Sequence, residues 1–491
     1  MLYLILLFTV LFFILAWRRL TWAVMFLIVT MPTYLIRFSI FGLPGTLLEI
    51  MIWVVFVIWL IKNYRFIFRS LKLKIENYKL KIANRYPFDW EMILLLLIAF
   101  MAVAVAGFSS SSLGIFKAYF FEPVMFFIVV FNVMKNPSRP PLLKGVELVL
   151  WSLAISAFAV SVLAIYQKIT GAFIYNPIWA AADTRRVVSF FGYPNAVGLY
   201  LGPIILIMIG WLSSVISSPS FSEGEKSLKD FLTLKGFLTN VQNDKMKVFF
   251  ISLTIIVSTL SIYFAKSKGA LLGVATGLMV FGLMINKKIR WATIIILILM
   301  GIGIAAYQPA RNLAIENITF TNKSGQIRMI GWQETWRMLK DGRLITGAGL
   351  ANFKTAVAPY HAEGFFIETG EADWLKKIRA SAEYRKQMWQ PLEIYLYPHN
   401  IILNFWSELG LAGIMLFVWI ILKYFWMGIK NYQLPNAKYK YINIGLICAM
   451  VVIVVHGIVD VPYFKNDLSV MFWLFVAMIS MINLEKYENN I

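Results

Sequence analysis

Residues 247–307 have the sequence KVFFISLTIIVSTLSIYFAKSKGALLGVATGLMVFGLMINKKIRWATIIILILMGIGIAAY, in which the short breaks AKSK and NKKIR separate three long apolar runs. A helix needs roughly 20 apolar residues to cross the hydrocarbon core of a bilayer, and somewhat fewer where flanking residues snorkel. Each run is close to that length. The segment therefore predicts three consecutive membrane-spanning helices.

The rest of the chain has the same character. Of its 491 residues, 60% are hydrophobic, 16% are aromatic and only 14% are charged, whereas about a quarter of the residues in a soluble domain are charged. This composition indicates a polytopic membrane protein and excludes most soluble enzyme classes. The single cysteine, Cys448, lies in an apolar run and there are three histidines, which excludes disulfides and argues against a transition-metal site. We expect no cofactor.

The same length criterion predicts about thirteen spans in an all-α transmembrane bundle. They lie near residues 2–16, 20–36, 45–61, 90–107, 114–134, 145–166, 189–215, 247–264, 269–285, 291–307, 400–427, 441–459 and 467–484. The N-terminal stretch MLYLILLFTVLFFILAW has no basic residues before its apolar run, so we expect a retained first span and no signal peptide.

Loop charges predict the orientation, because Lys and Arg are retained on the cytoplasmic side of a membrane. The loops at 62–89 and 216–246 are placed there, and the net charge of +21 is explained by such loops without a nucleic-acid partner. The predicted organisation is transmembrane helices over 1–307, a long, mostly helical extracytoplasmic (periplasmic) loop over 308–398, and C-terminal transmembrane helices over 399–491. We expect a multi-pass protein of the cytoplasmic (inner) membrane, with its active site facing the periplasm or cell exterior.

Ionisable side chains collect at the predicted outer ends of the spans, and such groups at a membrane are functional candidates. They are Arg185 and Arg186 in TRRVVSFFGYPNAVGLYLGP, Lys266 and Lys268 in AKSKGALLG, Arg328, His399 in PHNIILNFWSELGLAG, and His456 and Asp460 in HGIVDVPYFKND. Asn400 follows His399 directly, and Glu408 is a charged residue farther inside the same predicted span. If these ends converge, they form a cationic pocket that requires an anion. A polyprenyl diphosphate fits, because guanidinium groups bind phosphate oxygens bidentately and a neutral histidine can activate an acceptor hydroxyl.

Each candidate also has a structural interpretation. His399 could cap the helix that follows it, and the cations could be snorkelling residues without a ligand. His456 and Asp460 are four residues apart and could form a hydrogen bond on one helix, or Asp460 could orient a catalytic group. Glu408 could pack against a polar partner instead of acting on substrate, and His361 is expected to be an ordinary loop histidine.

Taken in chain order, these motifs resemble the O-antigen ligase and O-antigen polymerase superfamily. The block RRVVSFFGYPNAVGLYL resembles its R…F…PN element, AKSKGALLG its Ser-Arg-Gly turn, and IRMIGWQETWRMLKDGRLITGAGLANF its Arg…Trp…Asp…Gly-x-Gly…Phe motif. PHNIILNFWSELGLAG is similar to its His-Asn…Glu-Leu-Gly element and HGIVDVPYF to its closing His…Asp-x-Pro. Together they cover roughly residues 180–465.

The resemblance implies inverting, metal-independent transfer of a glycan from undecaprenyl diphosphate to a hydroxyl acceptor, which could be lipid A core, a glycan or a protein. It implies that His399 activates the acceptor and that Arg328 and Arg186, or its neighbour Arg185, bind the diphosphate. Lys268 stands where the family usually carries arginine, which keeps the charge but loses the bidentate geometry. Supporting roles fall to Asp460, His456, Asn400 and Glu408.

Other functions remain open at this level. The enzyme could be a ligase that uses a different acceptor, or a polymerase that extends the lipid-linked glycan. A transporter or flippase for a lipid-linked oligosaccharide could use the same cationic cavity. Transporters commonly show internal repeats, and the sequence has no convincing one. A structural scaffold would have no need of the outward cations.

Overall fold

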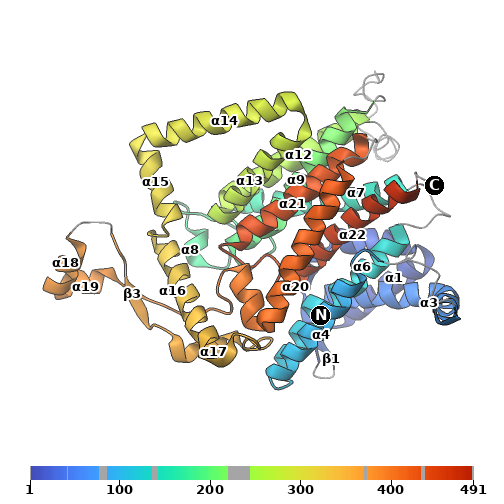
Figure 1. Ribbon diagram of the computed structural model, residues 1–491, viewed down its shortest axis with the longest axis horizontal. Coiled ribbons are helices and arrows are strands. Elements are labelled where there is room, and N and C mark those ends of the chain that lie inside the picture. Colours follow the sequence, from blue (N-terminus) through green and yellow to red (C-terminus); the bar gives the residue numbers. More distant parts are fainter. Residues whose placement is uncertain are drawn as a thin grey trace.

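The protein, seen in a computed structural model, is almost entirely helical (Figure 1). The structure describes residues 2–40, 43–76, 86–134, 142–218, 244–369, 373–432 and 437–488. The predicted all-α fold class is confirmed. Parts of the two predicted cytoplasmic loops, residues 77–85 and 219–243, lie outside the described residues.

Every predicted span falls on a helix. These helices are α1 (Leu2–Arg18), α2 (Leu20–Val29), α3 (Leu47–Glu76), α4 (Asp89–Val105), α5 (Ser110–Phe116) continued by the π-turn η2 (Lys117–Phe121) into α6 (Glu122–Met134), α7 (Leu142–Thr170), α9 (Pro194–Ile216), α12 (Asp244–Ala265), α13 (Lys268–Ile285), α14 (Lys287–Ala306), α20 (Ile401–Asn431), α21 (Ala437–Gly457) and α22 (Asn466–Glu488). Among the described residues, ten helical segments are long and apolar enough to span a membrane, whereas α1 and α2 are shorter apolar helices.

The second predicted span is shorter than expected. Helix α2 ends at Val29, and the chain continues as the 3-10 helix η1 (Met31–Leu35) and the antiparallel hairpin β1 (Arg37–Ile40) and β2 (Leu43–Thr46). Pro32 explains the break, because proline in a helix interior removes a backbone hydrogen bond and clashes with the preceding turn.

Helix α9 lies at the centre of the bundle, packed against α21 and α12 (Figure 1). The backbones of α9 and α21 touch where two glycines cross. A Cβ added to Gly210 would lie 2.9 Å from the Cα of Gly445 and 2.6 Å from the carbonyl oxygen of Tyr441. Small residues at such crossings let membrane helices pack closely, so this contact fixes the two helices whose ends border the site.

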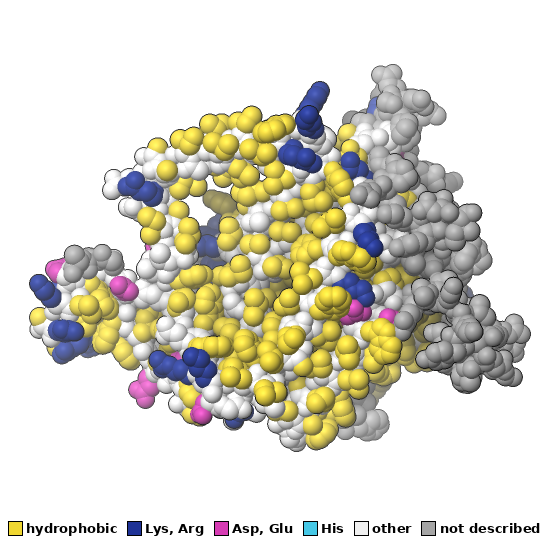
Figure 2. Space-filling model, in the orientation of Figure 1, with side chains coloured by type: hydrophobic (Ala, Val, Ile, Leu, Met, Phe, Trp, Pro, Cys, Tyr) yellow, Lys and Arg dark blue, Asp and Glu magenta, His cyan; other side chains and the backbone are white. Residues whose placement is uncertain are grey.

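Helix α14 stands apart from this core. It is as apolar as the other spans, yet none of its residues is buried in the protein. Figure 2 shows its apolar side chains and an opening between it and the bundle. Helix α15 (Gln308–Ile318) turns from its end toward the remaining part of the loop region (Figure 1).

Residues 308–398 form a mostly helical region against one end of the bundle, here called the loop end. After α15 the elements are α16 (Lys323–Met338), the π-turn η4 (Leu339–Arg343), α17 (Phe353–Val357), the 3-10 helix η5 (Ala358–Tyr360), β3 (Gly364–Phe366), α18 (Trp374–Ala380), α19 (Ala382–Met388) and β4 (Trp389–Pro391), which pairs antiparallel with β3; the short helix α8 (Pro177–Ala180) precedes α9. The helical run that begins with α16 is interrupted at Gly342, whose φ is +77°.

The GAGLANF segment attaches this region to the bundle. Gly347 and Gly349 both have positive φ, and a Cβ on either would overlap backbone atoms of α20 or of the end of α4. Glu408 on α20 accepts a hydrogen bond from the amide of Ala351 at 2.7 Å. Both glycines are therefore required by close backbone contact, and the segment holds the loop region in place above the bundle.

Candidate active site

His399 lies immediately before α20 at the loop end. Its φ of +49° is in the left-handed region, which is uncommon for residues other than glycine, and such strained positions cluster at functional sites. The helix cap is Asn400, whose side-chain oxygen accepts hydrogen bonds from the amides of Ile402 and Leu403 at 3.0 Å. The interpretation of His399 as the cap is therefore wrong.

Asp460 faces His399 from the loop that follows α21. Nδ1 of His399 lies 3.8 Å from Oδ1 of Asp460, and the aspartate side chain is 1% exposed. Nδ1 is buried and has no hydrogen-bond partner among the described residues. The ring therefore meets the carboxylate at its buried edge, at a distance slightly too long for a hydrogen bond.

The expected placement of His456 and Asp460 on one helix is wrong. Helix α21 ends at Gly457, so His456 lies in its last turn and Asp460 lies beyond it. His456 is buried against the first turn of α13, where a Cβ on Gly269 would lie 2.7 Å from its ring. The two residues still interact electrostatically.

The carboxylate of Asp460 is held as an anion. Burial raises its pKa, but the contact with His399, the charge of His456 and a hydrogen bond from the amide of Val461 outweigh burial and lower the pKa to about 2. Asn195 donates a hydrogen bond to Oδ2 at 3.3 Å. A buried negative charge thus faces the His399 ring.

Arg186 joins the same group through Asn195. Its Nη2 donates to Oδ1 of Asn195 at 3.3 Å, and its Nε donates to the carbonyl oxygen of Ala265 at 3.0 Å. Burial lowers the pKa of Arg186. In the sequence, Asn195 is marked only by its place after Pro194 in the R…F…PN element. The contacts form a chain from Arg186 through Asn195 and Asp460 to His399.

Arg185, the neighbouring arginine, has different contacts. Its guanidinium donates to the carbonyl oxygens of Lys168 at 3.0 Å, Ile169 at 3.2 Å and Ala180 at 3.2 Å. The first two belong to the last turn of α7, where carbonyl groups lack helical partners. Arg185 therefore caps α7.

Arg328 connects α16 to the loop that carries Asp460. Its Nε donates to the carbonyl oxygen of Val459 at 2.9 Å, and its Nη1 donates to the hydroxyl of Ser324 at 2.5 Å. Burial lowers its pKa, although the charge of Asp460 acts in the opposite direction. A cation on the loop region is thus fixed beside the carboxylate.

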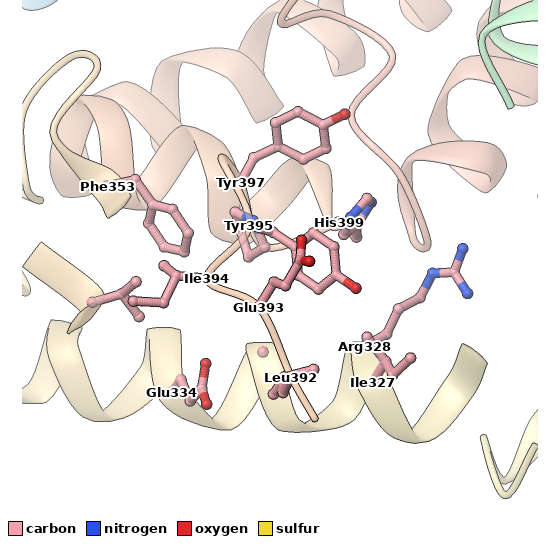
Figure 3. Close-up of a pocket in the computed structure, with 13 residues that line it drawn as sticks. Ile327, Arg328, Glu334, Phe353, Leu392, Glu393, Ile394, Tyr395, Tyr397 and His399 are labelled. Atoms are coloured by element: carbon pink, nitrogen blue, oxygen red, sulfur yellow. The ribbon is translucent and has the colours of Figure 1, made fainter. Parts of the chain in front are cut away.

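A pocket opens between α16 and residues 392–398, here called the strap, which lead from β4 to His399. Arg328 and His399 lie at the same end of this pocket (Figure 3). The rings of Tyr395 and Tyr397 lie edge-on to the His399 ring, with centroids 5.2 and 4.9 Å away. The remaining lining residues are Ile327, Gly331, Glu334, Phe353, Val357, Leu392, Glu393, Ile394 and Pro398.

The remaining predicted residues lie around this group. Lys266 and Lys268 flank the turn between α12 and α13. Nζ of Lys266 donates to the carbonyl oxygen of Thr184 at 3.3 Å, and Nζ of Lys268 donates to Oδ1 of Asn317 on α15 at 3.2 Å. Both contacts are exposed. The turn therefore faces α15 and residues 181–186.

Glu408 and Asn400 connect segments of the protein at this end. Glu408 holds the GAGLANF segment, and Nδ2 of Asn400 donates to the carbonyl oxygen of Ile458 at 3.0 Å, which ties α20 to the loop after α21. Within the described ranges, the His, Cys, Asp and Glu side chains form no group of three suited to holding a metal ion.

Residues 253–418, roughly a third of the chain, match the family model described as O-antigen ligase. The match includes Lys266, Lys268, Arg328, His399, Asn400 and Glu408, whereas Arg185, Arg186, His456 and Asp460 lie outside it. No curated protein matches the chain. The match confirms the resemblance of this part of the membrane protein to the O-antigen ligase and polymerase superfamily.

Proposed function

We propose that the protein is a membrane glycosyltransferase that moves a glycan from undecaprenyl diphosphate to a hydroxyl acceptor on the outer face of the cytoplasmic membrane. Transfer inverts the anomeric centre and uses no metal. One observation carries the proposal: His399, its partner Asp460 and two partly buried arginines, Arg186 and Arg328, converge at the loop end of an apolar bundle.

His399 acts as the base. Its Nδ1 edge is buried against Asp460, which leaves the edge with Nε2 for the acceptor. The carboxylate stabilises the positive charge that the ring gains when it takes a proton. Nε2 removes the proton of the acceptor hydroxyl, and the oxygen attacks the anomeric carbon from the side opposite the diphosphate.

The arginines act on the leaving group. The bond between the anomeric carbon and the phosphate oxygen breaks as the new bond forms, and the diphosphate departs with the electron pair. Arg186, Arg328 and Lys268 supply positive charge where negative charge develops, and fixed charges of this kind lower the barrier without reorganisation. The existing hydrogen bonds of Arg186 and Arg328 to backbone carbonyls hold them ready.

The acceptor reaches His399 through the pocket beside the strap. Glu393 and Tyr395 line it next to the histidine, and Phe353 and Val357 form its apolar wall. Carboxylate and tyrosine side chains can accept and donate hydrogen bonds with sugar hydroxyls, and aromatic rings pack against the apolar faces of sugars. A polysaccharide or a glycolipid core suits such a lining.

The test is a size profile of lipid-linked glycan in cells that lack the protein and are complemented with wild type, His399→Ala or Leu396→Ala. Leu396 is a strap residue that is 72% exposed, so its truncation is the matched control. We expect wild type and Leu396→Ala to restore transfer. Cells with His399→Ala should accumulate glycan on the outward-facing carrier at a normal protein level. Full transfer by that variant would show that His399 is not the base.

The same profile separates the alternatives. Long chains on the outward-facing carrier indicate a ligase, and single repeats indicate a polymerase that extends the lipid-linked glycan. Glycan that accumulates on the cytoplasmic side instead indicates a flippase and contradicts the proposal.

A further inference from the structure

His361 makes contacts that the sequence did not suggest. Its Nε2 lies 3.1 Å from the carbonyl oxygen of Leu392, and its Nδ1 lies 3.3 Å from Oε1 of Glu334. The exposed fractions of the histidine and glutamate side chains are 13% and 8%. His361 thus connects α16 to the first residue of the strap from a position behind the pocket.

Both partners of the ring are acceptors. A carbonyl oxygen and a carboxylate cannot donate, so both contacts are hydrogen bonds only when each ring nitrogen carries a proton. Glu334 also accepts a hydrogen bond from the amide of Ala362 at 2.8 Å. The carboxylate therefore holds both the ring of His361 and the backbone beside it.

The strap needs such support because it has no regular secondary structure. Its first residue, Leu392, is held by two contacts: its carbonyl oxygen accepts a hydrogen bond from protonated Nε2 of His361, and its amide donates to the carbonyl oxygen of Glu363 at 3.0 Å. At its far end the chain enters the left-handed conformation of His399. A backbone of this kind persists only where its surroundings over-determine it.

We propose that His361 is a positioning residue. Together with Glu334 it braces the start of the strap against α16, so that Tyr395, Tyr397 and the His399 ring keep their places at the mouth of the pocket. This inference rests on the proposed role of His399. The expected effect is large, because a displacement of about 1 Å at a catalytic group can cost roughly 100-fold in rate.

The test combines strap mobility with glycan transfer in the full-length protein. A nitroxide on Leu396→Cys reports the mobility of the strap, since this side chain is exposed, and the native Cys448 is buried. The label is compared in His361→Gln, His361→Asn and His361→Ala. The amide nitrogen of glutamine can take the place of Nε2 and keep the bond to Leu392, whereas that of asparagine takes the place of Nδ1 and keeps only the Glu334 contact.

Tyr360→Phe is the control. Tyr360 precedes His361 and its hydroxyl donates to Asp341, so the variant breaks a neighbouring hydrogen bond without touching the strap. We expect wild-type spectra and transfer for Tyr360→Phe and near-wild-type values for His361→Gln. His361→Asn and His361→Ala should show a more mobile label and a transfer rate that is lower by roughly 10- to 100-fold.

Three results would overturn the inference. One is an unchanged label spectrum in His361→Ala, and another is identical behaviour of the asparagine and glutamine variants. A mobile strap with unchanged transfer would refute the positioning role. Failure of the proposed function is distinguishable from all three, because it shows as full transfer by His399→Ala whatever the label reports.

Discussion

Helices α9 and α14 have almost the same mean hydropathy, 2.1 and 2.2, but 78% of α9 is buried inside the protein and none of α14 is. In a soluble protein an apolar helix must find a partner, whereas in a bilayer lipid solvates it as well as a neighbouring helix does. Hydropathy therefore locates spans without showing which of them form the core. Both helices contain glycine, but Gly210 of α9 meets the backbone of α21, whereas a Cβ on Gly301 or Gly303 of α14 would meet nothing within 4 Å.

The same contrast extends to the loop end. The ends of α9, α20 and α21 position the group of Arg186, Asp460 and His399, and their contacts are partly buried. The hairpin of α14 and α15 reaches this region through an exposed hydrogen bond from Lys268 to Asn317. We therefore expect large effects from changes in the inner helices and small ones from changes in the outer hairpin.

The largest effect is expected at the crossing of α9 and α21. In Gly210→Leu the added side chain overlaps the backbone of α21, and overpacking costs about 1–3 kcal/mol or more. In Gly301→Leu on α14 a Cβ meets nothing within 4 Å, so that variant should keep the wild-type stability. The yield and melting temperature of the two purified proteins measure the difference. Equal stability would contradict the division into inner and outer helices.

Asp460→Asn tests the group of Arg186, Asp460 and His399 directly. The variant keeps the shape of the side chain but removes the charge that faces His399, and we expect transfer to fall by roughly 100-fold, the scale of general-base catalysis. A mixed result, with normal transfer and lowered stability, would assign Asp460 to folding alone. Steady-state transfer rates at matched protein levels provide the measurement.

The pKa of Asp460 predicts how the loss of transfer in Asp460→Asn depends on pH. The native pKa of about 2 lies below the ordinary value of 3.8, so the stabilisation that the carboxylate supplies is complete above pH 3.8 and disappears only as the pH falls through about 2. The ratio of wild-type to Asp460→Asn transfer should therefore be free of any Asp460 titration between about pH 5 and 8.

The sequence predicted the fold class and the places of most spans, because apolar length is a local feature. Charged helix ends are local as well, and they mark His399, Asp460 and Arg328 as candidates, which the structure brings together. The resemblance favours Arg186 and leaves Arg185 as the alternative, since neighbouring residues share most local signals; the tertiary fold places Arg185 against the end of α7 and Arg186 against Asn195. The sequence marks His361 only as an ordinary loop histidine. Its contact with Leu392 is not visible there, because the two residues are 31 positions apart in the chain.

The smallest effects are expected where the outer hairpin meets the site. Lys268→Arg keeps the positive charge and should leave transfer within about threefold, whereas Lys268→Glu places a negative charge near the proposed site of the diphosphate and should lower transfer by about 10-fold. Asn317→Ala removes the contact of Lys268 with α15 and should have no effect if the lysine serves the donor. Complementation with the three variants measures transfer. If Lys268→Glu and Lys268→Arg are equally active, the turn does not meet the diphosphate, and the outer hairpin then has no part in the reaction.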